Sequence, residues 1–137
     1  ALQCAACLRR IMLGRDFQPR VFSALDYPPE QLAYERALLL VTGAREHGRP
    51  PETAEPFYER LVTLGGLNLR RLRYSVAALG VSAAAGERHC GRDFDVALAA
   101  QGGVRVYPRL ECEHDYEVPF AVWTSGVLAA LREQLPA

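Results

Sequence analysis

The sequence predicts an α/β fold in which a mainly parallel sheet is covered by helices on both faces, giving three layers. Strand-like and helix-like segments alternate along the chain, an order typical of parallel sheets joined by right-handed crossovers. Residues 37–42, ALLLVT, are apolar at nearly every position, as in a strand buried on both faces. Residues 72–95 have the pattern of a strand, a loop and a helix, the unit that places ligands at the carboxyl edge of such a sheet.

The first half of the chain contains two predicted strands. Residues 5–13 form a short amphipathic pattern that predicts a helix. Residues 20–24, RVFSA, predict a strand, and Pro28-Pro29 then interrupt any regular element. Residues 30–36 are expected to form a partial turn of helix before the apolar strand at 37–42.

The second half of the chain predicts five further elements: a helix over 52–64, a strand over 72–79, a helix over 92–100, a strand over 104–107 and a helix over 118–134. Residues 110–117 are expected to form an acidic loop before the last helix. All 137 residues are assigned to one domain, which is long enough to have its own core.

The charge balance favours neither a nucleic acid nor a membrane as partner. Sixteen basic residues, all of them arginine, are matched by sixteen acidic ones, so no net field attracts a polyanion. No apolar run is long enough to span a bilayer. Contacts to RNA phosphates remain an alternative because the chain has two small arginine groups, Arg9-Arg10 and Arg70-Arg71 with Arg73. Groups of this size are more often solvated or paired with acidic side chains.

Cysteine and histidine patterns predict no metal site. Cys4-x-x-Cys7 lacks a second ligand pair at zinc spacing. Three histidines and two cysteines fall in loops that the fold would bring to one edge, but without a recognised ligand spacing: His47, His89, His114, Cys90 and Cys112. The cysteines are better explained as small apolar residues in a reducing, intracellular compartment.

Several motifs occur in a characteristic order: Asp26-Tyr27, Gly48-x-Pro50-Pro51, Leu79-Gly80 with Ser82, Gly91, Asp93-Phe94-Asp95, Tyr107-Pro108-Arg109, Cys112 and Trp123. Their order and spacing resemble the flavodoxin-like, FMN-binding domains of diflavin reductases, most closely those of sulfite reductase flavoproteins. The resemblance covers essentially the whole chain. It implies a parallel sheet of order 2-1-3-4-5, with FMN at the carboxyl ends of the strands where that order reverses.

The resemblance also assigns a cofactor site and shows where this chain departs from it. Gly48, Gly80 and Ser82 match positions that lie against the flavin. The family's phosphate loop, in which backbone N–H groups hold the anion, corresponds to residues ahead of Ala1. The first strand is therefore expected to be missing from this chain, and the domain to be incomplete at its N-terminus. Ala84 occupies the position of the tyrosine that stacks on the flavin in the family. The stacking of a base on an aromatic side chain stabilises binding by about 1–3 kcal/mol, which indicates how much binding free energy the loss of that ring would cost.

These departures predict a domain that keeps the fold without the cofactor. We expect no bound cofactor, no catalytic residues, and a role as a structural or interaction subunit of a larger intracellular assembly. The missing strand would lie between 20–24 and 37–42, so an upstream segment or a partner subunit is expected to cover those edges. The alternative is an FMN-binding electron-transfer domain of an NADPH-dependent diflavin reductase, in which the flavin supplies the redox chemistry.

Overall fold

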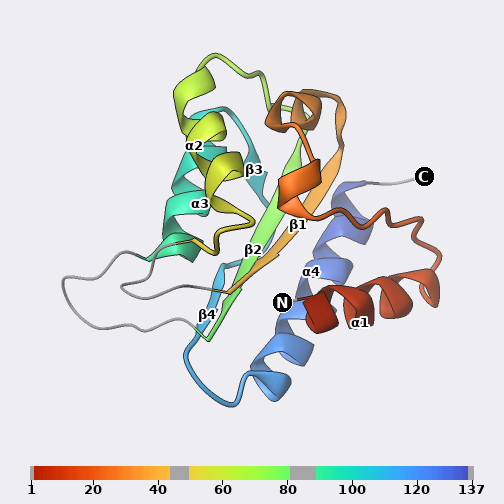
Figure 1. The fold of residues 1–137 in the computed structure, drawn as a ribbon. Coiled ribbons are helices and arrows are strands. Elements are labelled where there is room, and N and C mark those ends of the chain that lie inside the picture. Colours follow the sequence, from red (N-terminus) through yellow and green to blue (C-terminus); the bar gives the residue numbers. More distant parts are fainter. Residues whose placement is uncertain (1, 44–49, 81–88, 136–137) are drawn as a thin grey trace.

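The computed structural model describes residues 2–43, 50–80 and 89–135. Its elements, labelled in Figure 1, are α1 (Leu2–Leu13), the short 3-10 helices η1 (Ala24–Asp26) and η2 (Pro29–Tyr34), β1 (Ala37–Thr42), α2 (Glu55–Leu64), β2 (Arg73–Leu79), α3 (Cys90–Ala100), β3 (Val104–Arg105), β4 (Leu110–Cys112) and α4 (Glu117–Gln134).

The sheet is parallel throughout. β1 pairs with β2 along its whole length, from Ala37 opposite Arg73 to Thr42 opposite Ala78. β3 and β4 both pair with β2, β3 at its start and β4 at its end. They therefore act as two pieces of one edge strand, and the interruption between them contains Pro108, which has no N–H to donate to a ladder.

Helices cover the two faces of the sheet, which gives the predicted three layers (Figure 1). α2 and α3 pack on one face, in a core that contains Phe57, Tyr74 and Phe94. α1 and α4 pack on the other, in a core that contains Leu8 and Trp123. The predicted α/β class with helices on both faces is confirmed. No described helix is both long and apolar enough to cross a membrane.

A short chain of polar contacts joins α4 to the sheet. Trp123 Nε1 donates to Ser75 Oγ at 2.9 Å, and Ser75 Oγ donates to the carbonyl of Tyr107 at 3.0 Å. Ser75 and Trp123 are almost fully buried. Because buried polar groups need partners, these bonds fix the position of α4 against β2 and the interrupted edge strand.

Two sequence-based assignments are wrong. Residues 20–24 are not a strand: residues 17–23 are irregular, and Ser23 caps η1 by accepting a hydrogen bond from the Leu25 N–H at 3.2 Å. The expected acidic loop at 110–117 includes β4, because residues 110–112 pair with β2. The remaining elements are confirmed with shifted ends; α1 begins at Leu2 rather than at residue 5.

Candidate functional site

The candidate site lies where three parallel strands end at one edge of the sheet. β1 ends at Thr42, β2 at Leu79 and β4 at Cys112, and α3 begins beside them at Cys90. The Gly80 N–H donates to the Cys112 carbonyl at 2.7 Å, which extends the contact between β2 and β4 past the end of the ladder. In open α/β sheets, ligands bind in the crevice outside such carboxyl ends.

Two glycines shape this edge. Gly80 is exposed, has φ +71°, and an added Cβ would meet no atom within 4 Å. The left-handed conformation favours glycine at this turn. Gly91, in the first turn of α3, has no such free space. A Cβ added there would lie 2.6 Å from the Cβ of Ala78. Glycine at 91 therefore lets the first turn of α3 touch β2 directly.

Cys90 ties the end of β1 to the start of α3. Its Sγ donates to the Gly43 carbonyl at 3.3 Å, and the residue is fully buried. Burial, assisted by the negative charge of Asp93, raises the pKa of the Cys90 thiol to about 11. Reactive cysteines have lowered pKa values and partial exposure. Cys90 is therefore a neutral thiol that links two elements rather than a nucleophile.

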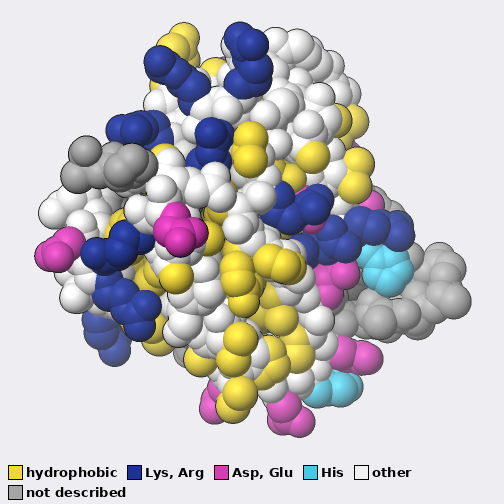
Figure 2. Space-filling model, turned by 180° about the vertical axis from the view of Figure 1, so that it is seen from behind, with side chains coloured by type: hydrophobic (Ala, Val, Ile, Leu, Met, Phe, Trp, Pro, Cys, Tyr) yellow, Lys and Arg dark blue, Asp and Glu magenta, His cyan; other side chains and the backbone are white. Residues whose placement is uncertain are grey.

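The segment that follows β4 is acidic. Glu111, the middle residue of β4, is exposed, as are Glu113 and Asp115 after it. Cys112 Sγ donates to the His114 carbonyl at 3.0 Å, which turns the chain back on itself before α4. Figure 2 shows the described histidines, in cyan, on the same side of the molecule as several acidic side chains. Glu111 lies 3.3 Å from Arg109 Nε, whereas the Glu113 and Asp115 side chains extend from the surface beyond it.

The predicted cofactor residues divide between described and undescribed parts of the chain. Gly80 lies at the carboxyl end of β2, as the resemblance implies. Gly48 and Ser82 lie outside the described residues, as do His47 and Ala84. His89 precedes the first residue of α3 and is half-buried. Within the described residues, no three or more His, Cys, Asp or Glu side chains come together as metal ligands.

One of the motif residues, Asp95, belongs to the core and not to the site. It lies on α3 with its side chain 1% exposed, and it accepts from Tyr74 Oη at 2.6 Å, Arg105 Nε at 2.9 Å and Arg109 Nη1 at 2.5 Å. Burial alone would raise the pKa of Asp95, but these hydrogen bonds outweigh it and hold the pKa below its ordinary value. The network fastens α3 to β2 and to the interrupted edge strand.

Comparisons with known proteins agree on one family. A family model described as Flavodoxin matches residues 1–119. The sulfite reductase [NADPH] flavoprotein alpha-component of Bacillus subtilis is 40% identical over 117 residues, which are 85% of this chain and 19% of that protein. The protein of the same name from Escherichia coli is 30% identical over 136 residues, 99% of this chain and 23% of that one. The chain thus spans about a fifth of the length of these relatives.

Solved flavodoxin structures have the same fold. Flavodoxin 1 from Bacillus cereus superposes with a TM-score of 0.79 at 13% identity, covering 98% of this chain and 90% of the other. A variant flavodoxin from Pseudomonas aeruginosa superposes with a TM-score of 0.75 at 19% identity, covering 96% and 90%.

These matches overturn one prediction. The expectation of no bound cofactor is wrong, because the matched family is that of the flavodoxins and the most similar relatives are named as flavoproteins. The prediction relied on side chains lost from Gly43, Ala44 and Ala84. Backbone N–H groups at strand and helix ends can hold an anion or a ring edge whatever the side chain is, so those replacements are not evidence against a cofactor. By the match over residues 1–119, the chain belongs to the flavodoxin family.

Proposed function

We propose that this chain is the FMN-binding, electron-transfer domain of a diflavin reductase related to the sulfite reductase flavoproteins. The observation that carries the proposal is the 40% identity to the Bacillus subtilis flavoprotein over 85% of this chain. The geometry supports it, because the described strand ends form the kind of edge at which parallel sheets bind ligands.

The described residues fit the flavin ring at this edge. Gly43 and Gly80 follow β1 and β2, and an added Cβ at Gly80 would point into open space, so the backbone there can be approached closely. Gly80 donates its N–H to Cys112, which holds its peptide plane in place. Such backbone groups would orient the ring through hydrogen bonds to its polar edge.

FMN, when bound, supplies the redox chemistry, since it can take up two electrons and pass them on singly. The protein residues would hold the ring and set its surroundings. The acidic segment at Glu111, Glu113 and Asp115 would disfavour the more negative, reduced form of the flavin and lower its reduction potential. Exposed Val118 and Val122 follow this segment on α4 and offer an apolar contact to an electron-transfer partner.

The remaining steps of such a reductase would take place outside this chain. The chain spans 19% and 23% of two relatives whose names include NADPH. We therefore place oxidation of NADPH and reduction of the final acceptor in other parts of the polypeptide or in partner subunits, and electron relay in this domain. The proposed compartment is intracellular, in agreement with four cysteines that are all unpaired.

The experiment is a titration of the purified chain with FMN, followed by flavin fluorescence. Gly80→Ala is the site variant, and Gly66→Ala is its matched control. Both glycines have left-handed φ values, +71° and +69°, and neither Cβ would meet an atom within 4 Å. Both substitutions should cost about 1 kcal/mol of folding stability, and only Gly80→Ala should weaken FMN binding, by about tenfold.

A chain that leaves flavin fluorescence unchanged at millimolar FMN would contradict the proposal. Equal losses of affinity for FMN in Gly80→Ala and Gly66→Ala would contradict a site at the carboxyl edge. The two positions share only their backbone strain, so such losses would reflect general destabilisation of the fold.

A further inference from the structure

A group of arginines lies where the central strands begin, at the opposite edge of the sheet from the candidate site. Arg36 comes directly before β1 and Arg73 opens β2, and the Arg73 N–H donates to the Arg36 carbonyl at 2.9 Å. Arg70 and Arg71 form the turn that leads into β2. We call these residues the amino-edge arginines. Figure 2 shows arginine side chains gathered at this end of the molecule, the top in Figures 1 and 2, with the acidic side chains lower down.

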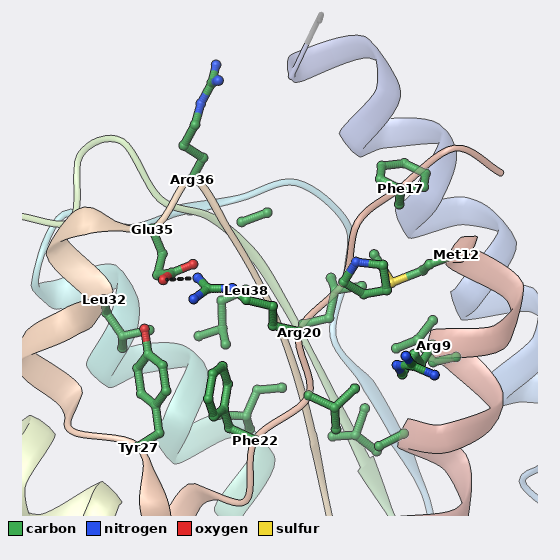
Figure 3. A pocket seen from close by; sticks show the side chains of 18 of the residues that line it. Arg9, Met12, Phe17, Arg20, Phe22, Tyr27, Leu32, Glu35, Arg36 and Leu38 are labelled. Atoms are coloured by element: carbon green, nitrogen blue, oxygen red, sulfur yellow. Dashed lines mark hydrogen bonds and ion pairs between the residues drawn. The ribbon is translucent and has the colours of Figure 1, made fainter. Parts of the chain in front are cut away.

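The described part of the chain does not neutralise the amino-edge arginines. No carboxylate of the described residues forms an ion pair with any of them. The two acids of the neighbouring η2 segment are paired elsewhere: Glu30 lies 2.6 Å from Arg60 Nη2. Glu35 lies 2.6 Å from Arg20 Nη2. Figure 3 shows the Glu35 carboxylate turned toward Arg20, while the side chain of Arg36 points away from both.

Neutral acceptors hold two of the guanidinium groups in place. Arg73 Nη1 donates to the Arg70 carbonyl at 3.0 Å, and Arg70 Nε donates to Asn68 Oδ1 at 3.2 Å. Because these acceptors carry no charge, the bonds orient the two head groups and leave their positive charges intact. Donors that are held before binding lose less side-chain entropy when a ligand arrives. The arrangement therefore favours an anionic ligand.

Tyr34 adds an aromatic surface beside these charges. It is 88% exposed, more than any other large hydrophobic side chain of the described residues. Together with Ala33, Asn68, Arg70 and Arg71 it lines an open hollow of about 610 Å³, a volume in the range of ligand-binding pockets. Tyrosine and arginine are the residue types that are enriched at the energetic centres of protein interfaces. The hollow thus combines positive charge with one apolar contact.

We propose that the hollow and the amino-edge arginines form a docking site for a short, extended acidic segment of a partner protein. The fork of an arginine side chain can bind a carboxylate through two parallel hydrogen bonds, and Tyr34 would take an apolar side chain of the same segment. The six residues of β1 separate this edge from the candidate site, a distance of about 20 Å. A bound segment would therefore hold the domain without covering the carboxyl ends of the strands.

The distribution of charge favours a peptide over a nucleic acid. A nucleic acid carries a phosphate at every step, so a strand that crossed the hollow would also bring phosphates toward Glu30 and Glu35 at η2. A peptide can place its carboxylates over the arginines and uncharged residues beyond them. The chain has as many acidic as basic residues, so no net field attracts a long polyanion.

The test titrates the chain into a fluorescent, capped peptide, Gly-Glu-Asp-Leu-Glu-Asp-Gly, and follows the anisotropy. Arg71→Gln is the site variant, and Arg92→Gln is its matched control. Both arginines are exposed and both changes remove one charge, but Arg92 lies in the first turn of α3 at the carboxyl edge. Arg71→Gln should weaken peptide binding by about threefold, and the double variant with Arg36→Gln by about tenfold. Arg92→Gln should leave the affinity unchanged.

Tyr34 separates docking from simple charge attraction. Tyr34→Ala should weaken peptide binding by about threefold and Tyr34→Phe should not, because the contact is apolar. Since the side chain is 88% exposed, the midpoint of urea unfolding should be unchanged in both variants. The affinity of every variant for the peptide should fall as salt is added, because the remaining ion pairs are screened.

Four results would overturn the proposal. Equal losses of affinity in Arg71→Gln and Arg92→Gln would mean diffuse attraction without a site. Tighter binding of an oligothymidylate with the same charge as the peptide would assign the hollow to nucleic acid. Displacement of the peptide by saturating FMN would place the peptide at the carboxyl edge. Self-association of the chain that blocks the peptide and is reversed by salt would make the acidic segment of a second copy the occupant.

Discussion

The Tyr74 hydroxyl donates to the Asp95 carboxylate at 2.6 Å, and both side chains are buried between β2 and α3. Arg105 and Arg109 from the edge strand region reach the same carboxylate. One acid therefore links a central strand, a helix and an interrupted edge. A buried charge that is fully hydrogen-bonded costs little, but the same charges become costly when one partner is removed.

Asp95→Asn should lower the free energy of unfolding by about 2–3 kcal/mol, because two arginines would lose their carboxylate. This value lies at the low end for a buried pair because the Arg105 side chain is 45% exposed. Tyr74→Phe should cost about 1 kcal/mol, the value of one buried hydrogen bond. Urea unfolding measures both. Arg60→Ala, which breaks the exposed pair with Glu30, is the control and should leave the midpoint unchanged.

The same carboxylate should make stability depend on acid. Asp95 has a folded-state pKa below its ordinary value, so it contributes stability above the unfolded pKa of about 3.9 and loses that contribution as pH falls through the folded pKa. Unfolding followed from pH 6 to pH 2 should show a steep loss below about pH 4. The curve for Asp95→Asn should be flatter; two parallel curves would show that other acids cause the loss.

Much of the fold could be predicted because its signals are local. The apolar run of β1 and the helical spacing in α2 and α4 identify those elements from neighbouring residues alone. The strand expected at 20–24 failed because a strand also needs a partner edge, and no strand pairs with those residues in the described chain. Phe22 packs on Tyr27 instead. β4 was missed for the converse reason: its acidic sequence is typical of a loop, but β2 supplies the ladder.

The site could be predicted only in part. The carboxyl edge and Gly80 followed from the strand–loop–helix pattern and the family motifs. The Cys90 to Gly43 bond joins residues 47 positions apart, and the Tyr74 to Asp95 bond joins residues 21 apart, so neither has a local signal. A lone acid on the apolar side of α3 was the one available hint that Asp95 is paired. The absence of polar side chains from the loops led to the wrong prediction that no cofactor binds. Backbone N–H groups can also hold a ligand, and a sequence comparison does not show them.

Gly91→Ala should destabilise the fold by about 1–3 kcal/mol through overpacking. The new Cβ would lie 2.6 Å from the Ala78 Cβ, and α3 would have to move away from β2. Combining it with Ala78→Gly should recover part of the loss, because the second change removes the opposing methyl group. Urea unfolding of the two single variants and the double variant gives the coupling. Additive losses would mean that α3 shifts freely and that this contact does not fix the site.

Cys90 should be inert to thiol reagents in the folded protein. Burial raises the pKa of this thiol to about 11, so almost none of it is the reactive thiolate at pH 8. Exposed Cys7 should react with Ellman's reagent within minutes, and Cys90 only when urea unfolds the chain. Cys7→Ser identifies the fast phase and Cys90→Ala the denaturant-dependent one. A fast phase that disappears in Cys90→Ala would show that the end of β1 opens readily.

Riboflavin and FMN should bind this chain with similar affinity, within about threefold. The described strand ends offer backbone contacts to a ring edge, through Gly43 and Gly80, and the two ligands share that ring. Fluorescence titrations of both ligands at low and high salt make the comparison. The affinity for FMN should also change little with salt, because few charges would pair with the phosphate. FMN binding that is a hundredfold tighter than riboflavin binding, and weakened by salt, would place a phosphate site within these 137 residues and shift attention to the amino end of α3, where N–H groups could hold an anion.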